Sequence, residues 1–370
     1  MQESFDILSS SGRYCVYIST DSNFKDEVLN PNTIILADER ILAHLPESFK
    51  QSIITISAEE TNKSLENIPP ILNRLRQLGA NRESEIIAIG GGIIQDVATF
   101  VSSIYMRGVK WDYYPTTLLG MVDSCIGGKS SINVGQYKNL IGNFFPPQKI
   151  VVELSFLNSL NSEQIISGLC EAVKICYARG ESEFEKYLDS SPSANLSETQ
   201  FGEIILLSLK AKKWFIEVDE YDQKERLLLN FGHTFGHAIE SATLFRIPHG
   251  IAVGLGMLIG IDYSMCRQLL SFYGEKRCER LREYLLSLII ISPETFALLK
   301  QIDSEELMEK FDGDKKHSKD HYRMIIPIAE GELVLHSVYK DSFNRNELMN
   351  IVRKSILNTL AIWSKSMKSF

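Results

Sequence analysis

Cysteine is scarce in this 370-residue chain, and its cysteines form no regular framework. The six thiols are spread along the sequence without a CxxC pair, at Cys15, Cys125, Cys170, Cys176, Cys266 and Cys278. A chain of this length can build a core without disulfide bonds, and such spacing is typical of reduced thiols. The cysteine pattern therefore favours a cytoplasmic protein and excludes a small disulfide-rich secreted domain.

An excess of positive charge is also absent. Lys plus Arg total 39 against 47 Asp plus Glu, which gives a formal net charge of −8 at pH 7. We therefore expect no nucleic-acid partner, although a local basic pocket is compatible with this total. The start, MQESFDILSS, has no basic n-region, and the most apolar window, at 250–261, is too short to span a bilayer. We expect a cytoplasmic protein without a membrane partner.

The first 160 residues alternate short β-rich runs with helical patterns. The β-rich runs lie at 13–19, 32–39, 51–57, 84–90, 110–117 and 149–155, and the clearest helical patterns at 60–78 and 94–106. Such alternation is typical of a mostly parallel sheet with helices on both faces. The sequence therefore predicts an α/β domain over residues 1–160.

The remainder, residues 161–370, is mainly helical in pattern. Helical periodicity occurs at 161–180, 198–217, 230–245, 250–272, 275–290 and 344–368. One extended pair, 321–328 and 331–338, predicts a hairpin. We therefore expect a second, mainly α-helical domain over residues 161–370.

A glycine-rich turn follows the β-rich run at 84–90. The segment SEIIAIGGGIIQD places Gly90, Gly91 and Gly92 between a strand and a helix start. Glycines at this point let the backbone approach a phosphate and leave helix N–H groups available to bind it. The spacing differs from the G-x-G-x-x-G dinucleotide fingerprint, so a tight turn without a ligand is the alternative.

Polar chemistry is dense at 113–144, YYPTTLLGMVDSCIGGKSSINVGQYKNLIGNF. Adjacent hydroxyls at Thr116 and Thr117 suit ribose or phosphate contacts. Four side chains could hold a phosphate by charge-assisted bonds, namely Arg107 just upstream and Lys129, Lys138 and Asn139. A solvated basic loop is the alternative, which the apolar, glycine-rich character of the segment disfavours.

Charged side chains also stand among apolar neighbours in GLCEAVKICYARG, at 168–180. Glu171 and Lys174 lie one turn apart on the expected helix. Their immediate neighbours are apolar, which favours a buried pair. A surface ion pair is the alternative.

The segment around NFGHTFGHAIE carries a polar stripe. Arg226, Asn230, His233 and His237 have spacings of four, three and four, so on a continuous helix they would form one stripe of an otherwise apolar helix. Because Arg226 lies close to the helix start, we expect the stripe to begin in a non-helical approach. Buried polar groups without partners are destabilising by about 1–3 kcal/mol each, so the stripe must be satisfied. A metal ion and an anionic ligand would satisfy it.

A third histidine, His249, follows in IPHGIAVGLGM. Two histidines and one carboxylate with open coordination positions form a catalytic zinc arrangement. Spacing alone favours His233 and His237 as joint ligands. Core histidines bonded to backbone carbonyls are the alternative.

These segments together resemble the 3-dehydroquinate synthases of the sugar-phosphate cyclase superfamily. The resemblance covers about residues 30–330, and its motifs follow the family's order: GGGIIQD, YMRG, PTTLLGMVDSCIGGKSSIN, KNLIGNF, SGLCEAVK, LNFGHTFGHAIE, HGIAVGLGM and DKK. It implies a Rossmann-like NAD-binding α/β domain at 1–160 and a helical metal- and substrate-binding domain at 161–370. It also implies a homodimer.

The resemblance further implies where cofactor and metal bind. NAD is expected at Asp38, Glu60, Lys63, Gly91, Gly92, Asp96, Thr116, Thr117, Lys138 and Ser159. A divalent metal, zinc or alternatively cobalt, is expected on Glu171, His233 and His249. His237 would then face the substrate rather than the metal.

The substrate contacts implied by the resemblance are spread over both domains. The substrate phosphate is expected at Lys129, Asn139, Asn230, His237 and Lys316, preferred over Lys315, with Arg107 reaching it from the partner subunit. Lys212 and Arg226 are expected to hold the substrate carboxylate. The catalytic set comprises Lys129, Lys174, His237, Asp123 and Asn230.

The reaction implied by the resemblance converts a sugar-acid phosphate, 3-deoxy-arabino-heptulosonate 7-phosphate, to 3-dehydroquinate and phosphate. Transient oxidation by NAD, phosphate elimination, return of the hydride and intramolecular aldol closure follow one another, so NAD is regenerated. The metal would act as a Lewis acid.

Several positions depart from the family's usual pattern. Gln95 replaces a glycine, Gly120-Met121 replaces Ala-Gln, Cys125 replaces a serine, Arg40 replaces an asparagine, and Ile251 replaces a glutamate. The departures leave related substrates open: an amino analogue, sedoheptulose 7-phosphate or glucose 6-phosphate. Lys212 and Arg226 favour an acid, and His237 argues against the sedoheptulose type. A metal-dependent polyol dehydrogenase and a non-catalytic binding protein are further alternatives.

Overall fold

The computed structural model describes residues 2–20, 30–50, 52–135, 137–289 and 293–366. The chain divides into two compact units. Unit 1 comprises Met1–Asn161 and Asn195–Tyr221, and unit 2 comprises Ser162–Ala194 and Asp222–Phe370. The first division falls within a residue of the expected boundary. The segment 195–221, which the sequence analysis assigned to the second domain, instead clusters with unit 1.

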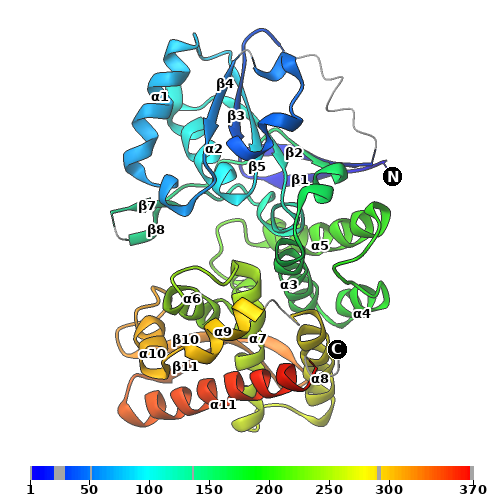
Figure 1. The fold of residues 1–370 in the computed structure, drawn as a ribbon, viewed down its shortest axis with the longest axis vertical. Helices are drawn as coiled ribbons and strands as arrows, with labels where there is room; N and C mark the ends of the chain where they lie inside the picture. The colour runs from blue at the N-terminus through cyan, green and yellow to red at the C-terminus, as the bar shows by residue number, and fades with distance from the viewer. Residues whose placement is uncertain (1, 21–29, 51, 136, 290–292, 367–370) are drawn as a thin grey trace. The chain divides into compact units, whose positions relative to one another are not determined.

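A seven-stranded sheet forms the centre of unit 1 (Figure 1). Its order is β1 (Gln2–Ser9), β2 (Gly12–Ser19), β9 (Lys149–Glu153), β6 (Lys110–Pro115), β5 (Glu85–Gly90), β3 (Thr33–Asp38) and β4 (Ile53–Ile56). Only the β1–β2 pair is antiparallel. All residues of β3 are buried, as expected for a parallel strand covered on both faces. The six strands expected from the sequence are confirmed, and β1 is an addition to them.

Among the residues that the structure describes, three α-helices belong to unit 1: α1 (Ile68–Gln77), α2 (Gly92–Ile104) and α5 (Glu198–Val218). Helix α2 contacts β3, β5 and β6, while α5 contacts β1 and β2. The helix expected at 60–78 is wrong for its first part, which forms two short 3₁₀ turns at Glu60–Asn62 and Leu65–Asn67. α1 begins at Ile68, and Pro69 and Pro70 lie in its first turn, where the N–H groups that they lack would have no helical partner; a helix that began earlier would need these groups.

A small hairpin in unit 1 carries part of the expected site. It pairs β7 (Ile132–Val134) with β8 (Tyr137–Ile141). Asn139 lies within β8 at a φ of 51°, a left-handed conformation that asparagine tolerates better than most residues. The sequence analysis predicted neither strand.

Unit 2 is built mainly of helices. They are α3 (Ser162–Arg179), α4 (Glu181–Asp189), α6 (His233–Ala242), α7 (His249–Cys266), α8 (Phe272–Leu288), α9 (Pro293–Gln301), α10 (Ser304–Asp312) and α11 (Ser342–Ser366). The hairpin β10 (His321–Ile328) and β11 (Glu332–Tyr339) confirms the expected extended pair. The fold class, a parallel-sheet α/β domain followed by a helical domain, is confirmed. Helices α4, α9 and α10 were not expected.

Helix α7 is the central helix of unit 2. It contacts α3, α6, α8, α11 and β10. By length and composition α7 could cross a membrane, since the apolar window at 250–261 belongs to an 18-residue helix rather than a shorter run. However, 78% of this helix is buried inside the protein, which is the pattern of a core helix.

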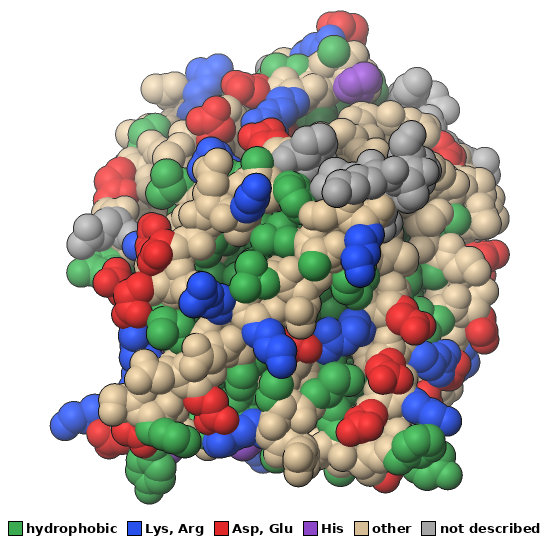
Figure 2. Space-filling view, turned by 60° about the horizontal axis from the view of Figure 1, so that its bottom comes forward, with side chains coloured by type: hydrophobic (Ala, Val, Ile, Leu, Met, Phe, Trp, Pro, Cys, Tyr) green, Lys and Arg blue, Asp and Glu red, His purple; other side chains and the backbone are tan. Residues whose placement is uncertain are grey.

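Positive and negative side chains are mixed on the face of the protein shown in Figure 2. Figure 2 shows one face, on which Lys and Arg side chains are interspersed with Asp and Glu. This distribution agrees with the modest formal net charge of −8.

Candidate functional site

The polar stripe lies partly before the helix that carries the histidines. Arg226 and Asn230 lie on a short 3₁₀ helix, Glu225–Asn230, and α6 begins afresh at His233. Between them Gly232 adopts a left-handed φ of 78°, and a Cβ at this position would lie 2.5 Å from the carbonyl oxygen of Val253. The helix expected from residue 230 therefore begins three residues later, at His233, because close contact with α7 requires a glycine turn here, and Arg226 precedes the helix as expected.

Three histidines of unit 2 converge despite this break. His233 and His237 lie one turn apart on α6, and His249 is the first residue of α7. The ring centroids are 5.4 Å apart for His233–His237, 5.4 Å for His233–His249 and 5.8 Å for His237–His249. One nitrogen of each ring lies within 4.8 Å of the others, close enough for the three to hold a metal ion.

Glu171, from α3, brings a carboxylate to the same point. Its side chain is fully buried, and Oε1 lies 3.8 Å from His233 Nε2 and 3.5 Å from His249 Nε2. Two ligands of a tetrahedral zinc ion stand about 3.4 Å apart, given bond lengths near 2.1 Å. Glu171, His233 and His249 therefore fit a divalent cation, and the donor set of one carboxylate and two imidazoles suits zinc or cobalt.

Burial controls the protonation of these imidazoles. Desolvation lowers the pKa of His233 well below its ordinary value and also lowers that of His237. Burial alone would lower the pKa of His249 too, but the charge and hydrogen bond of Glu240 raise it. The lowered pKa values of His233 and His237 favour neutral rings. A neutral imidazole keeps the nitrogen lone pair that a metal requires.

Glu240 is a site residue that the sequence analysis did not identify. Its Oε2 lies 3.0 Å from His249 Nδ1, so the carboxylate can orient the ring and present Nε2 to a metal. Its position could have indicated this, since it follows His233 by seven residues, two turns along the same helix face. Ile251, where the family pattern has glutamate, is fully buried and apolar. Glu240 therefore supplies the carboxylate next to this histidine.

Lys174 and Glu171 are in direct contact on α3, and both side chains are buried. The alternative of a surface ion pair is therefore wrong. A lysine beside the carboxylate offsets the charge that would otherwise be isolated in the interior of unit 2.

A second polar cluster adjoins His237. Lys316 Nζ lies 3.3 Å from His237 Nδ1 and 3.1 Å from Asp314 Oδ2. Burial alone would raise the pKa of Asp314, but His237 and Lys316 together lower it below its ordinary range. Lys315 is exposed whereas Lys316 is half-buried, which supports the preference for Lys316. Asp314 was not among the expected site residues.

The other expected substrate residues of unit 2 lie on the 3₁₀ helix before α6. Arg226 is buried, and Asn230 Nδ2 donates to the carbonyl oxygen of Leu227 at 3.1 Å. Arg226 precedes His233 by seven residues and Asn230 precedes it by three. Their expected contacts with phosphate and carboxylate stay predictions.

Unit 1 gathers most of the charged residues expected to bind NAD. Lys63 Nζ lies 3.0 Å from Asp96 Oδ2, 3.0 Å from Asn139 Oδ1 and 3.6 Å from Glu60 Oε1. Lys138 Nζ lies 3.5 Å from the same Glu60 oxygen. Asn139, expected at the phosphate, is thus part of this cluster. Burial raises the pKa of Asp96 to about 6, although Lys63 opposes the effect.

The glycine turn and the threonine pair of unit 1 lie against each other. Gly91 caps the N-terminus of α2, and a Cβ there would stand 3.0 Å from Thr117 Cγ2. The backbone N–H of Thr116 donates to the carbonyl of Gly90 at 3.0 Å. This leaves the first turn of α2, with Gly92, beside the two threonines, an arrangement suited to a phosphate group.

The remaining expected residues of unit 1 have local partners. Lys212 Nζ lies 2.5 Å from Asp123 Oδ1, so these two expected residues form a pair. Asp38 Oδ1 accepts from Arg40 N at 3.0 Å, and Ser159 Oγ donates to Phe156 O at 2.7 Å. Lys129 Nζ stands 5.8 Å from the ring centroid of Phe144. None of these contacts joins Asp38 or Ser159 to the Lys63 cluster, which comprises Glu60, Lys63, Asp96, Lys138 and Asn139.

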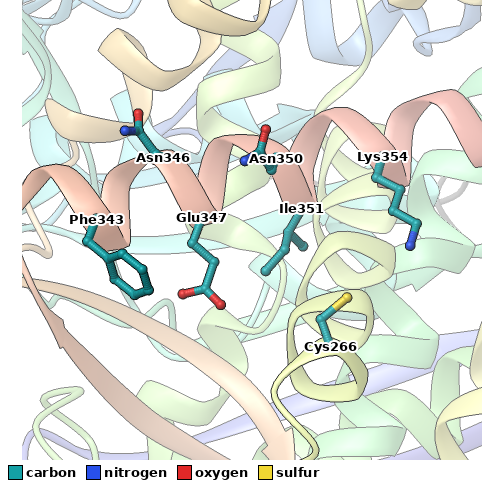
Figure 3. Close-up of a pocket in the computed structure, with 7 residues that line it drawn as sticks. All are labelled: Cys266, Phe343, Asn346, Glu347, Asn350, Ile351 and Lys354. Carbon is teal, nitrogen blue, oxygen red and sulfur yellow. The ribbon is translucent and has the colours of Figure 1, made fainter.

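Two surface pockets are lined by residues outside both clusters. One, of about 420 Å³, is lined by Cys266 and one face of α11 in unit 2, and Figure 3 shows Phe343, Glu347 and Ile351 pointing toward it. The other, of about 360 Å³, lies in unit 1 and is lined by Arg13, Tyr14, Trp111 and the exposed Arg107. Of the expected site residues, only Arg107 lines either pocket.

Comparison with known proteins adds a family to this geometry. The 3-dehydroquinate synthase N-terminal family model matches residues 53–167, and the 3-dehydroquinate synthase C-terminal model matches residues 168–317. The 3-dehydroquinate synthase of Dictyoglomus turgidum is 36% identical over 289 residues, which cover 77% of this chain and 78% of the relative. That of Helicobacter pylori is 31% identical and covers 90% of this chain and 93% of the relative.

Solved structures share the fold at lower identity. A 2-deoxy-scyllo-inosose synthase complexed with carbaglucose-6-phosphate, NAD+ and Co2+ has a TM-score of 0.81 at 24% identity, covering 94% of this chain and 100% of its own. A 2-epi-5-epi-valiolone synthase from Streptomyces hygroscopicus, with NAD+ and Zn2+ bound, has a TM-score of 0.71 at 20% identity, covering 94% and 96%. An iron-containing alcohol dehydrogenase from Thermotoga maritima reaches only 0.53 at 13% identity, covering 88% and 91%.

Proposed function

Because the chain belongs to the 3-dehydroquinate synthase family of the sugar phosphate cyclase superfamily, we propose that it converts 3-deoxy-arabino-heptulosonate 7-phosphate to 3-dehydroquinate and phosphate. The observation that carries the proposal is the convergence of Glu171 Oε1 with His233 Nε2 and His249 Nε2 at 3.5–3.8 Å. A polyol dehydrogenase of related fold would also hold a metal. The Lys316–His237 pair beside the histidines adds the cationic donors that a phosphate ester needs.

Glu171, His233 and His249 would hold zinc or cobalt, and the Lys63 cluster with the glycine turn of α2 would hold NAD. When bound, NAD accepts and later returns a hydride while the metal polarises the oxygen at the reacting carbon. Two cyclase structures of this fold support this choice of cofactors, since one complex contains NAD+ and Co2+ and the other NAD+ and Zn2+.

The residues of unit 2 divide the work of binding among them. Lys316, His237 and Asn230 would donate hydrogen bonds to the phosphate oxygens, and the buried guanidinium of Arg226 would hold the carboxylate. The Lys174 ammonium contacts Oε2 of Glu171 and would offset the charge of this buried carboxylate. A neutral His237, favoured by its burial, would donate through one N–H without adding charge to the pocket.

The residues of unit 1 would bind the remainder of the substrate. Lys129 is expected at the phosphate, and Lys212 with Asp123 at the carboxylate and the ring. Once the substrate is oxidised, the C–H next to the new carbonyl becomes acidic, and the substrate's own phosphate oxygen would accept the proton as the phosphate leaves. The enzyme thus mainly orients a reactive substrate.

Related sugar phosphates are the second candidate substrates. The fold likeness to 2-deoxy-scyllo-inosose synthase and the departures at Gln95 and Ile251 favour this alternative. Neutral sugar phosphates carry no carboxylate, so an enzyme for them would have less use for Arg226 and Lys212. These two cations therefore favour the acid substrate.

A substrate panel tests the proposal. Purified protein with NAD and Zn2+ or Co2+ is given 3-deoxy-arabino-heptulosonate 7-phosphate, sedoheptulose 7-phosphate, glucose 6-phosphate and a polyol, and release of inorganic phosphate and NADH absorbance are followed. We expect phosphate release from the acid without net NADH. Release only from a neutral sugar phosphate would establish the second candidate, and NADH accumulation on the polyol would indicate a dehydrogenase.

We also propose a cytoplasmic homodimer. The reduced-thiol pattern supports the compartment, and the family resemblance supports the dimer. Light scattering after size-exclusion chromatography tests the dimer, for which a mass near twice 41.9 kDa is expected.

A further inference from the structure

His233 and His237 have the four-residue spacing of a paired metal site, yet only His233 is expected to bind metal. The contacts of the other ring explain this difference. His237 Nδ1 lies 3.3 Å from Lys316 Nζ, within hydrogen-bond distance. An ammonium group has donors only, so the imidazole nitrogen facing it must be the acceptor. The proton of a neutral His237 therefore lies on Nε2, and an Nε2–H cannot bind a metal.

Lys316 is itself held by Asp314. Asp314 Oδ2 accepts from Lys316 Nζ at 3.1 Å, and Oδ1 accepts from the backbone N–H of Lys316 at 2.8 Å. The Asp314 side chain is only 6% exposed. Its Oδ2 is 3.6 Å from His237 Nδ1, which is longer than a good hydrogen bond and longer than the 3.3 Å contact of the same nitrogen with Lys316 Nζ.

The loop that carries both residues is fixed at a further point. His317 Nε2 lies 2.9 Å from the carbonyl oxygen of Phe311 at the end of α10. His317 Nδ1 accepts from the backbone N–H of Arg323, in β10, at 3.0 Å. The next residue along the chain from Lys316 is thus anchored to two elements of unit 2, so the aspartate and lysine stand on a constrained support.

We propose that Asp314 is a positioning residue whose carboxylate holds the Lys316 ammonium against His237 Nδ1, and so makes His237 an Nε2–H donor for the substrate phosphate rather than a metal ligand. This inference rests on the proposed function for the identity of the anion. Two donors, Lys316 and His237 Nε2–H, are thereby set in place before phosphate binds, which reduces the ordering that binding requires.

Inorganic phosphate is the probe for binding. Calorimetry on the zinc- and NAD-loaded protein measures its Kd, and we expect Asp314→Asn to raise the Kd about tenfold or more, as loss of a charge-assisted anchor does. Zinc content should not change. The steady-state KM for the substrate should rise more than kcat falls, because a binding contact shared by ground state and transition state is weakened.

A double-mutant cycle tests whether Asp314 acts through Lys316. In the Lys316→Met background, Asp314→Asn should change the phosphate Kd less than about twofold, since the group it positions is gone. Asp312→Asn is the matched control, because Asp312 binds Tyr322 and Arg345 instead, at 2.7 and 2.9 Å. That control should lower thermal stability and leave the phosphate Kd unchanged.

The ring itself provides a readout independent of phosphate. Nitrogen-15 NMR of histidine-labelled protein, with the signal assigned by its loss in His237→Asn, should show His237 as the Nε2–H tautomer. Asp314→Asn should weaken that preference.

Three results would overturn the inference: phosphate binding by Asp314→Asn equal to or tighter than wild type, an equal loss in the Lys316→Met background, or a protonated Nδ1 in the wild type. Failure of the proposed function looks different. The wild-type protein would then neither bind inorganic phosphate nor release it from any substrate of the panel, and the NMR result would still decide the tautomer.

Discussion

The Lys63 cluster of unit 1 and the histidine cluster of unit 2 satisfy their polar groups in different ways. Lys63 stands 3.0 Å from a carboxylate and 3.0 Å from an amide oxygen, so opposite charges already meet within hydrogen-bond distance. Around His233 the facing donor atoms are 3.5–3.8 Å apart, too far for hydrogen bonds and suited to a cation between them. The first cluster is preorganised by its own ion pairs, whereas the second is spaced to hold a cation.

This difference predicts different sensitivities. Removing one side chain from the unit 2 cluster should change the metal content and the chemistry. Removing one from the unit 1 cluster should redistribute hydrogen bonds and shift pKa values while the fold persists. The following variants test the contrast, from the largest expected effect to the smallest.

His249→Ala should abolish turnover, with a fall of about a thousandfold or more, because one of the three proposed metal ligands is lost. Bound zinc, measured by plasma mass spectrometry after dialysis, should fall in parallel. His336→Ala is the control, since His336 lies on β11 and contacts Tyr263. Full activity with stoichiometric zinc in His249→Ala would remove this histidine from the ligand set.

Lys174→Met should destabilise the metal-free protein by about 3–5 kcal/mol, because it leaves the buried Glu171 carboxylate without its adjacent cation. Zinc supplies a positive charge at the same carboxylate, so the loss should be smaller in the zinc-loaded protein. Urea unfolding with and without a chelator measures both values. Equal losses in the two states would mean that Glu171 does not face the metal.

Glu240→Gln should weaken zinc binding about 10–100-fold, because the amide holds the His249 ring less firmly than the carboxylate does. Competition with a chromogenic chelator measures the affinity. Glu347→Gln, which alters an ion pair with Arg267, serves as control and should bind zinc as wild type does. An unchanged affinity in Glu240→Gln would show that another group orients this histidine.

Asp96→Asn should change how stability depends on pH. Burial raises the folded-state pKa of Asp96 to about 6, so the folded protein binds more protons than the unfolded chain between pH 4 and 6, and stability falls as pH rises through that window. Asp96→Asn has no carboxyl group to titrate at this position, so the variant lacks this fall in stability. Relative to wild type it should gain on the order of 1–2 kcal/mol from pH 4 to pH 7, as measured by urea unfolding, whereas parallel profiles would contradict the assigned pKa.

The sheet of unit 1 was predictable because its buried parallel strands appear as short apolar runs between helices. Residues 84–90 and 110–117 correspond to β5 and β6 within two residues at each end. The edge strand β1 was not predicted because most of its residues are polar or exposed, so that it has no clear apolar pattern. The sequence analysis also did not predict that α5 belongs to unit 1. An amphipathic pattern indicates a helix but does not identify the sheet or helix against which it packs.

The histidine cluster was predictable only in part. Spacing pointed to His233 and His237, whereas the choice of Glu171 and His249 came from the family resemblance, because residues on separate helices have no common sequence period. The break at Gly232 is caused by the close approach of α7, which is a tertiary contact. The helical periodicity of the sequence continues across this position and therefore does not indicate the break. Asp314 lies in an irregular loop, where its contact with Lys316 follows from three-dimensional structure alone.

The crossing of α6 and α7 leaves no room for a side chain at Gly256. A Cβ there would stand 2.0 Å from the carbonyl oxygen of Gly232, the residue that precedes the first histidine of the cluster. Variation that changes the specificity of this scaffold should therefore leave the crossing unchanged and act on the side chains proposed to contact the substrate. A mutagenesis library aimed at new specificity should hold Gly232 and Gly256 constant and diversify positions such as Lys212 and Asn230.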